Sequence, residues 1–559
     1  MTSINQLHYG DNLDVLREKV ADSSVDLVYL DPPFNSNRKF NVLFSRGTYT
    51  DEAQIQAFDD TWHWTPQTEE QFDDFINGGL PLDVADALGA FRMLLGENDM
   101  LAYLVNMAPR LVELRRVLKP TGSLYLHCDP TASHYLKIVL DAIFDARYFR
   151  NEIIWKRFSA KNDPKRFGRN HDVILFYTKG PKFTWNAQYG PFEDDYVAEN
   201  YRYVDPRSGR RYRRGDLTAA KPGGDVDYEW HGARPYKGRH WAYSREKMDQ
   251  MLAEGRIEFR STGMPVFRRY LDEQPGVALQ DLWTDIRLTS GSKERLGYPT
   301  QKPVALLERI IQASSNPGDI VLDPFCGCGT AIDAATRLKR RWIGIDITYI
   351  AVDLIRNRLI DRFGPSVAET YEISGIPRDR LGAAALWERS PLDFERWAVS
   401  LVGGTPNEKQ VGDKGVDGVI RFHHTQGRGA PDGRIAVSVK GGHQLTPSMV
   451  QALDGALNTH HAQMGLMVTL HRPTKGMRDI ANRAGTYRWP MNGETFPRLQ
   501  ILTVAELLAG AKLRTPSRLL PYISAIRHVD DGRQGSFDDP EAMSATVDGS
   551  ASTSQPEAG

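Results

Sequence analysis

Short apolar runs that end in an aspartate constrain the fold of this chain most. Residues 24–31 (SVDLVYLD), 319–323 (DIVLD) and 341–346 (RWIGID) close on Asp31, Asp323 and Asp346. Such runs are typical of strands buried on both faces of a parallel sheet. Apolar spacing predicts two further strands, at 122–128 and 152–155. It also predicts helices at 101–118, 134–147, 303–315 and 330–338. The alternation predicts an α/β fold with a parallel sheet and crossover helices.

The length of 559 residues indicates more than one domain. From about 158 to 290 the pattern becomes irregular and rich in Gly, Pro, Arg and aromatic residues. A linker near 374–390 is predicted to lead to a second strand-helix block at about 391–512. The segment 528–559 is rich in Ser, Gly and Asp without periodic apolar positions, which is typical of disorder. We therefore expect domains at 1–378 and 388–512 and a disordered tail at 528–559.

Composition excludes several protein classes. The formal net charge is -1, so binding to a polyanion would have to come from local clusters of charge. The three cysteines, Cys128, Cys326 and Cys328, are too few for a disulfide framework and lack the spacing of a zinc site. The N-terminus is polar, and no apolar run reaches membrane-spanning length. These features predict a cytoplasmic protein without membrane contact.

A glycine turn follows one of the predicted strands, in the segment Val321–Thr330 (VLDPFCGCGT). Gly327 and Gly329 allow a ligand to approach the backbone, and the next helix offers free N–H groups at its N-terminus. Ligands bind at such strand ends in doubly wound sheets. Asp346, at the end of the following strand, is suited to hydrogen-bond ribose hydroxyls. A tight structural turn and a nicotinamide-binding site remain alternatives for these residues.

A second motif, Asp31-Pro32-Pro33-Phe34, follows another predicted strand. An exocyclic amine is a poor nucleophile because its lone pair is delocalised into the ring. The Asp31 carboxylate and the Pro32 carbonyl can accept both amine hydrogens and so direct that lone pair at a methyl sulfonium. The prolines fix the backbone and add no competing N–H, and Phe34 offers a face on which an extruded base can stack. A sharp strand-ending turn is the alternative interpretation.

These two motifs resemble the catalytic and cofactor motifs of the amino-DNA methyltransferases. Their order, DPPF at 31–34 before DPFCGCGT at 323–330, resembles the beta class, which includes the type III modification subunits. GDNLDVL from Gly10, GSLYLHCD at 122–129 and YPTQKP at 298–303 also resemble elements of this family. The resemblance covers roughly residues 5–362.

The resemblance implies a seven-stranded Rossmann-like sheet with circularly permuted motif order and S-adenosyl-L-methionine as cofactor. It places Asp323, Phe325, Gly327 and Gly329 at the methionine side of the cofactor and Asp346 at the ribose. Asp11, Gln301 and Lys302 would lie nearby. Asp rather than Ser at position 31 favours N6 of adenine as the target, with N4 of cytosine as the alternative. Neither motif carries a nucleophilic cysteine beside the prolines, which argues against carbon-5 chemistry.

The irregular segment 158–290 lies where this family inserts its target-recognition region. Residues 207–214 (RSGRRYRR) hold five arginines, and Arg239 follows. Arginine side chains contact phosphates or guanine edges, and interleaved aromatic rings can stack on bases. We expect contact with double-stranded DNA through Arg210, Arg211, Arg213, Arg214 and Arg239. A solvated basic surface loop is the alternative.

The C-terminal block resembles the Mrr-type restriction endonucleases of the PD-(D/E)xK superfamily. Asp417 and Lys440 resemble that site, and the resemblance implies a Mg²⁺ ion there. Ser438 departs from the family pattern, because Gln or Glu usually stands two residues before the lysine. Glu395 on the preceding helix could supply a carboxylate. An inactive fold kept for DNA binding or assembly is the alternative.

Together these features predict a site-specific N6-adenine DNA methyltransferase of a restriction-modification system. The rivals are a bifunctional restriction endonuclease-methyltransferase, a non-catalytic DNA-binding module, and a methyltransferase acting on RNA or protein. The resemblance to modification subunits also implies a homodimer or a separate restriction subunit as partners.

Overall fold

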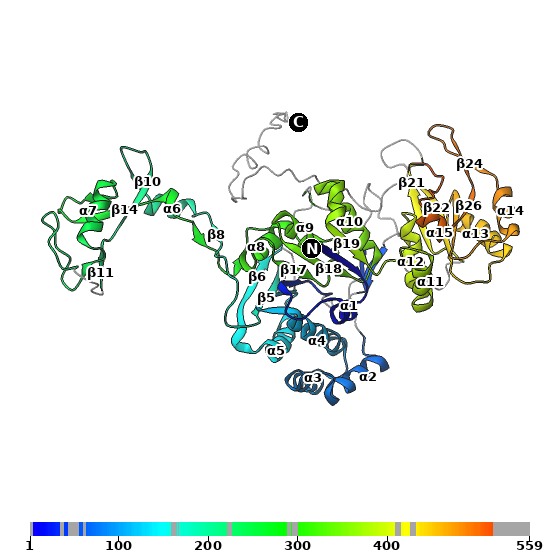
Figure 1. Cartoon of the computed structure of the whole chain (residues 1–559), viewed down its shortest axis with the longest axis horizontal. Helices are drawn as coiled ribbons and strands as arrows, with labels where there is room; N and C mark the ends of the chain where they lie inside the picture. Colours follow the sequence, from blue (N-terminus) through cyan, green and yellow to red (C-terminus); the bar gives the residue numbers. More distant parts are fainter. Residues whose placement is uncertain are drawn as a thin grey trace, which may run out of the picture. The chain divides into compact units, whose positions relative to one another are not determined.

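The computed structural model describes most of the chain. The described residues are 4–33, 39–42, 55–59, 63–157, 165, 167–220, 226–287, 292, 294, 300–407, 415–424 and 432–517. They divide into two compact units (Figure 1). The first consists of the described residues of Met1–Asn186 and Asp281–Asp530, and the second of those of Ala187–Gln280.

A mixed sheet of nine described strands forms the centre of the first unit. Its order is β16-β6-β7-β5-β2-β17-β18-β1-β19. The pairs that include β7 are antiparallel and the other described pairs are parallel. The strands are β1 (Asn5–Tyr9), β2 (Val25–Leu30), β5 (Leu118–Cys128), β6 (Phe149–Lys156), β7 (His171–Thr178), β16 (Leu282–Trp283), β17 (Ile320–Asp323), β18 (Arg341–Asp346) and β19 (Tyr371–Ser374).

Apolar side chains cover both faces of this sheet. Val28 and Leu30 of β2 pack in the core on one face. Leu27 and Tyr29 pack in the core on the other face, because successive strand residues point in opposite directions. β2 is therefore buried on both faces, which is why its sequence is apolar without alternation.

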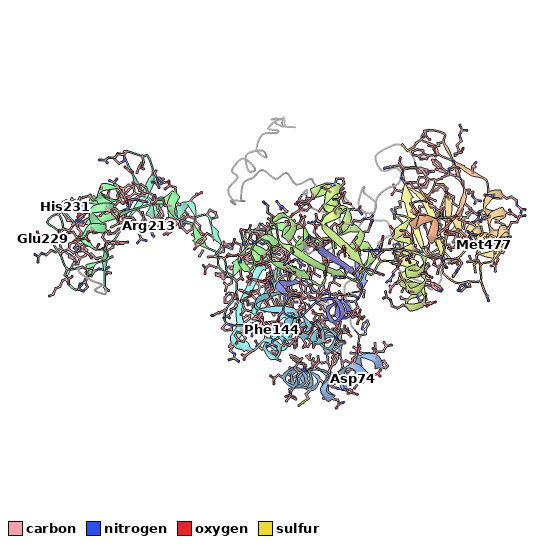
Figure 2. All side chains as sticks on the ribbon, in the orientation of Figure 1. Asp74, Phe144, Arg213, Glu229, His231 and Met477 are labelled. Atoms are coloured by element: carbon pink, nitrogen blue, oxygen red, sulfur yellow. The ribbon has the colours of Figure 1, made fainter. Side chains whose placement is uncertain are left out.

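Helices supply the other half of each core. One face is covered by α1 (Asn12–Lys19), α3 (Leu82–Leu95), α4 (Asp99–Val117) and α5 (Ser133–Phe144). The other face is covered by α8 (Val304–Ser314), α9 (Thr330–Arg337) and α10 (Tyr349–Phe363). Phe144, 1% exposed, lies at the end of α5 (Figure 2). α4 begins after Asn98, whose side chain accepts a hydrogen bond from the Leu101 N–H at 2.9 Å.

The predicted strands at 24–31, 122–128, 152–155, 319–323 and 341–346 are present, with shifted ends. So are the predicted helices at 101–118, 134–147, 303–315 and 330–338. The sheet has nine described strands rather than the seven that the resemblance implies, because β16 and β19 extend its edges. The prediction of irregular structure from residue 158 is wrong. β7 lies inside the main sheet, and the second unit begins at Ala187.

The second unit has a small aromatic core. Trp230 and Trp241, each 1% exposed, pack with Met248 of α7 (Arg245–Ala253). Its four-stranded sheet has the order β13-β14-β10-β9, and β11 pairs with β12. These strands are β9 (Tyr203–Val204), β10 (Arg211–Gly215), β11 (Thr218–Ala219), β12 (His240–Trp241), β13 (Ile257–Phe259) and β14 (Pro265–Tyr270). Arg213, Glu229 and His231 mark this unit in Figure 2.

The C-terminal part of the first unit contains a second sheet. Its five described strands follow the order β20-β21-β22-β23-β26, with β22, β23 and β26 parallel. They are β20 (Thr405–Pro406), β21 (Gly418–Phe422), β22 (Gly433–Lys440), β23 (Met464–Thr469) and β26 (Leu499–Thr503). Helices α12 (Pro391–Leu401), α13 (Pro447–Thr459) and α14 (Lys475–Arg483) pack against them; Met477 of α14, labelled in Figure 2, is fully buried.

The segment 374–390 was predicted to be a linker, and this prediction is wrong. It contains helix α11 (Arg380–Arg389), whose Ala383 and Leu386 are buried in the core of the second sheet. The tail 528–559 lies outside the described residues. Within the described ranges, every helix is too short or too polar to span a bilayer.

Candidate active site

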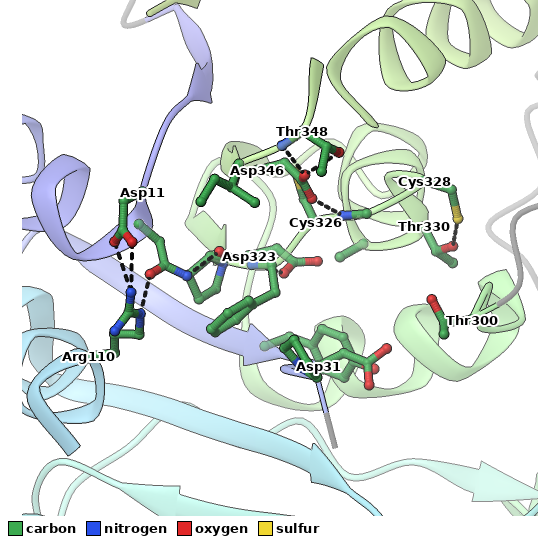
Figure 3. A pocket seen from close by; sticks show the side chains of 18 of the residues that line it. Asp11, Asp31, Arg110, Thr300, Asp323, Cys326, Cys328, Thr330, Asp346 and Thr348 are labelled. Carbon is green, nitrogen blue, oxygen red and sulfur yellow. Dashed lines mark hydrogen bonds and ion pairs between the residues drawn. The ribbon is translucent and has the colours of Figure 1, made fainter. Parts of the chain in front are cut away.

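The two sequence motifs meet at one edge of the main sheet. β17 pairs with β2 in parallel, with Val321 opposite Leu27 and Leu322 opposite Val28. Asp31 and Asp323, which follow or end these strands, therefore lie at the same carboxyl edge. A cavity of about 390 Å³ opens there (Figure 3). Of the predicted site residues, those that line it are Asp11, Asp31, Pro33, Gln301, Lys302, Asp323, Phe325, Gly327 and Asp346.

Gly327 and Gly329 have different functions in the glycine turn. Both adopt positive φ angles, +48° and +73°, which only glycine adopts without strain. Gly327 lines the cavity, and its N–H donates to Asp346 Oδ2 at 2.8 Å. Gly329 is not among the lining residues: a Cβ on it would lie 2.7 Å from Ile355 Cγ1. Gly329 thus lets α10 pack closely against the turn.

Asp346 is held in place by its own neighbours. The N–H and the hydroxyl of Thr348 both donate to Asp346 Oδ1 at 2.8 Å, while Gly327 occupies Oδ2 (Figure 3). Burial raises the pKa of this carboxyl. A carboxylate oxygen can accept a second hydrogen bond, so Asp346 can shape the turn and still contact a ligand hydroxyl.

Asp11 positions the segment that follows β1. It accepts the Leu13 N–H at 2.7 Å, which caps α1, and pairs with Arg110 Nη2 at 2.8 Å. Arg110 also donates to Asn12 Oδ1 at 2.7 Å, and Asn12 Nδ2 donates to the Pro324 carbonyl at 2.8 Å. These bonds connect α4 and α1 to the glycine turn. Sequence analysis missed Arg110, although a charged residue between the apolar positions of α4 is a signal for such a contact.

The Asp31 carboxylate is paired with Lys302. The Lys302 ammonium donates to Asp31 Oδ2, and its side chain is 8% exposed. Asp31 Oδ1 has no hydrogen-bond partner among the described residues. Sequence analysis expected Lys302 beside the cofactor, and the structure adds that it holds one oxygen of Asp31 while leaving the other to the cavity. Phe34 lies outside the described residues, and Pro32 is not among the lining residues.

A buried polar chain lies behind Asp31, and sequence analysis missed it. Tyr29, which lines the cavity, bonds His127 Nδ1 at 2.9 Å, and His127 Nε2 bonds Asp172 at 3.0 Å. Arg157 donates to the other Asp172 oxygen at 3.0 Å. Burial lowers the pKa of His127. Although burial opposes it, the His127 hydrogen bond keeps the pKa of Asp172 low. A neutral imidazole beside a carboxylate donates through Nε2, so Nδ1 accepts a hydrogen bond from the Tyr29 hydroxyl.

Three carboxylates give the cavity an anionic wall. Asp31, Asp323 and Asp346 come from neighbouring strands (Figure 3). Burial raises the pKa of Asp323 well above its ordinary range, and the charges of Asp31 and Asp346 add to this effect. Buried like charges are costly unless a cation joins them. Lys302 already pairs with Asp31, whereas Asp323 and Asp346 have no ion-pair partner among the described residues, so this side of the cavity fits a positively charged ligand.

Most of the predicted DNA-contacting arginines are paired within the second unit. Arg210 bonds Asp272 at 2.8 Å and Glu273 at 2.6 Å. Arg214 pairs with Glu258, and Arg239 with Asp216 at 3.1 Å. Arg213 donates to the Tyr196 hydroxyl at 3.2 Å. Arg211 is exposed and has no ion-pair partner among the residues described.

The nuclease-like residues do not form a metal site. Asp417 Oδ2 accepts the Val439 N–H at 2.6 Å and lies 3.5 Å from Lys440 Nζ. Ser438, the residue that departs from the family pattern, donates to the same oxygen at 3.4 Å. No group of three His, Cys, Asp or Glu side chains in the described part of the chain could hold a metal ion, and Glu395 on α12 joins none. The expectation of Mg²⁺ is therefore not supported.

Comparison with known proteins decides the family. The sequence profile described as DNA methylase matches residues 25–357, more than half of the chain. The chain belongs to the DNA methylase family. The type II methyltransferase M.EcaI of Enterobacter cloacae is 36% identical to this DNA methylase over 360 residues, covering 63% of it and 69% of the relative.

Two further relatives are similar to this DNA methylase. The StyLTI Mod subunit, a type III restriction-modification enzyme of Salmonella typhimurium, is 27% identical over 59% of the chain and 49% of its own length. The DNA adenine methyltransferase YhdJ of Escherichia coli is 26% identical over 62% of the chain and 81% of its own length. Residues 392–509 match a different profile, described as NACHT-associated inactive Restriction Endonuclease 1.

Proposed function

We propose that this DNA methylase transfers a methyl group from S-adenosyl-L-methionine to N6 of adenine in double-stranded DNA, as part of a restriction-modification system. The observation that supports this proposal best is that Asp31 and the glycine turn, almost three hundred residues apart, line one cavity. Asp at position 31 and the similarity to an adenine methyltransferase favour adenine over cytosine as the target.

The residues of the cavity fit this cofactor. Its volume of about 390 Å³ lies in the range of small-molecule sites, and its anionic wall suits a sulfonium and an ammonium group. S-adenosyl-L-methionine, when bound, supplies a methyl group on a positively charged sulfur. Asp346 would hold the ribose, and Asp323, Phe325 and Gly327 would line the methionine side. Gln301, 9% exposed, and Asp11 would complete the walls.

Asp31 prepares the target amine. Its Oδ1 accepts one amine hydrogen and the Pro32 carbonyl accepts the other, which turns the nitrogen lone pair toward the methyl group. Lys302 holds Oδ2 and so fixes the orientation of the carboxylate. The two prolines offer no N–H that could compete for either acceptor. Phe34 would stack on the extruded base.

Sequencing of modified bases in DNA from cells expressing the chain tests this proposal. N6-methyladenine at a defined site, absent with an Asp31→Ala variant, is the expected result. N4-methylcytosine would instead support the second target, which the same acceptors can serve. Unmodified DNA together with methylated RNA or protein would overturn the proposal.

We further infer a circularly permuted methyltransferase fold. β2, which carries the catalytic motif, precedes β17, which carries the glycine turn, and the two strands are neighbours in the sheet. For residues 388–512 we propose a restriction-endonuclease-like fold without cleavage activity, because Asp417 is engaged by Lys440 and the Val439 N–H. A separate restriction subunit would then cut the DNA, and it would co-purify with the methylase.

We propose that the second unit contacts DNA. Among the residues described, Arg211 is free to do so, whereas Arg210 is held by ion pairs within the unit, so the two side chains should contribute differently. Arg211→Ala should lower DNA affinity and reduce the slope of affinity against salt by about one charge. Arg210→Ala should have a smaller effect, because Asp272 and Glu273 already neutralise this side chain. The combined change of Arg210, Arg211, Arg213 and Arg214 to Ala should flatten the salt dependence further. Fluorescence anisotropy across a salt series measures DNA affinity for all three variants. Equal effects of Arg210→Ala and Arg211→Ala would contradict the prediction that the ion-paired arginine contributes less.

Cofactor affinity should weaken as the pH falls. The raised pKa of Asp323 means that this carboxyl takes up a proton as the pH falls, and the cavity then loses a negative charge beside the cation. At higher pH the carboxylate forms and binding strengthens. Calorimetric titration of the cofactor at a series of pH values measures the effect. The Asp323→Asn variant should bind the cofactor more weakly, and its affinity should depend less on pH. If the affinity of that variant changed with pH as in the unchanged chain, Asp323 would not be the group that titrates.

A further inference from the structure

Two residues of the cavity wall lie beyond the C-terminal end of the segment, 25–357, that matches the DNA methylase profile. Asp393 and Arg396 line the cavity together with Asp346, Ile347 and Thr348. Both lie on α12, within the region that matches the inactive restriction endonuclease profile. The nuclease-like part of the chain thus contributes to the wall of the methyltransferase cavity.

Packing explains how α12 reaches the cavity. Phe394 and Trp397, both fully buried, belong to the core of the second sheet. Tyr349 at the start of α10 packs against that same core, and its ring meets Tyr9 edge-on at 6.3 Å between centroids. One face of α12 is thus fixed by apolar contacts. Asp393 and Arg396, three positions apart, share another face.

The position of α12 identifies the end of the cavity that it covers. The Tyr9 ring contacts Tyr349, which packs against the same core as Phe394 of α12. Tyr9 is opposite Asp346 in the β1–β18 pair. Asp346 is the residue assigned to the ribose. α12, which carries Asp393 and Arg396, therefore packs at the Asp346 end of the cavity, the end assigned to the adenosine.

Both charged side chains are without a protein partner in the part of the chain that the structure describes. Among the described residues, the Asp393 carboxylate and the Arg396 guanidinium have no hydrogen-bond or ion-pair partner. A carboxylate can accept hydrogen bonds from the exocyclic amine of an adenine ring, and a guanidinium can donate to its ring nitrogens or stack on its face. The pair offers what an adenosyl group requires.

We propose that Asp393 and Arg396 bind the adenosine half of the cofactor, so that the nuclease-like domain has become part of the cofactor site. This inference rests on the proposed function, since it takes S-adenosyl-L-methionine as the ligand. It gives the domain a function that needs no metal ion and no cleavage. By linkage, a cofactor that contacts α12 stabilises the position of that helix, and any change that displaces the helix weakens cofactor binding.

Calorimetric titration of the full chain tests the inference with two ligands. Asp393→Ala and Arg396→Ala should each lower the affinity for S-adenosyl-L-methionine about tenfold or more, as expected for a lost charge-assisted hydrogen bond. 5′-Methylthioadenosine, which shares the adenosine half and lacks the amino acid, should lose affinity by the same factor. Arg380→Ala on α11, an exposed arginine that does not line the cavity, is the matched control and should leave both affinities unchanged.

Other outcomes overturn the inference. Affinities within twofold of the unchanged chain would show that α12 makes no energetic contact. A loss confined to S-adenosyl-L-methionine would move the contact to the methionine half. Should either variant unfold, hydrogen exchange of the unchanged chain decides: cofactor must slow exchange of the α12 amides, and equal rates would refute the contact.

The same measurements separate this inference from the proposed function. A chain that binds no S-adenosyl-L-methionine at all would refute both. A chain that binds the cofactor and methylates adenine, but tolerates Asp393→Ala and Arg396→Ala without loss, would refute only the contribution of α12.

Discussion

Asp31→Asn should lower the rate of methyl transfer by about 10²- to 10³-fold, the range seen when one oriented hydrogen-bonding group is removed from a reaction centre. The variant keeps the volume of the side chain but loses the charge and places an NH₂ group where an acceptor is needed. The amine lone pair then stays delocalised in the ring. Single-turnover methylation with saturating cofactor and DNA measures this step apart from binding.

A matched control lies in β2, the strand that Asp31 follows. Asp26 of β2 pairs with Lys119 at 2.7 Å, as Asp31 pairs with Lys302, but it does not line the cavity. Asp26→Asn also breaks an Asp–Lys pair and should leave the methylation rate unchanged. A loss of less than tenfold in Asp31→Asn, or an equal loss in Asp26→Asn, would show that Asp31 does not act on the amine.

Asp333→Ala should reduce the local free energy of unfolding by about 3–5 kcal/mol, the cost of breaking a buried ion pair from one side. Asp333 is fully buried and pairs with Arg358 at 2.8 Å and Arg362 at 3.1 Å. Its removal leaves two largely buried guanidinium groups without their anion. Hydrogen exchange of the α9 and α10 amides measures the change, since a chain with several cooperative units has no single unfolding free energy.

The effect should extend to the cofactor. Arg358 Nη1 donates to the Cys328 carbonyl at 2.9 Å, so the buried pair supports the glycine turn from below. Cofactor affinity should fall in the same variant. Arg356→Ala breaks a half-exposed pair with Asp353 on the same helix and should cost no more than about 1 kcal/mol. If Asp333→Ala and Arg356→Ala lowered the local free energy of unfolding by similar amounts, the buried ion pair of Asp333 would not have the special stabilising effect proposed here.

Sequence analysis found the strands and both motifs of the methyltransferase part because their signals are local. An apolar run ending in Asp31 or Asp323 is visible within ten residues, and so is a glycine turn before a helix. β7 was missed although HDVILFYT is an apolar run, since its irregular Gly- and Arg-rich surroundings suggested that the whole segment lay outside the sheet. α11 was missed because a short helix with little amphipathic character resembles a linker.

The arginines show where such reasoning ends. RSGRRYRR looks like free positive charge in sequence, yet Asp272 and Glu273, on a 3-10 turn after β14, and Glu258 of β13 pair with two of its arginines. Which charges pair depends on strand register, and this register is set by contacts between segments more than forty residues apart.

The amino-acid sequence alone determined the α/β class, the two motifs and the order of the two matched regions, and it suggested the chemistry proposed for Asp31, since each follows from neighbouring residues. Only the tertiary structure decided that Lys302 holds Asp31, that Gly329 serves packing against α10, and that α12 supplies part of the cavity wall. The physical reason is that the order of strands in a sheet and the packing of helices on it decide which side chains meet. Both bring together residues that are far apart in the chain, so separation in sequence does not predict distance in space.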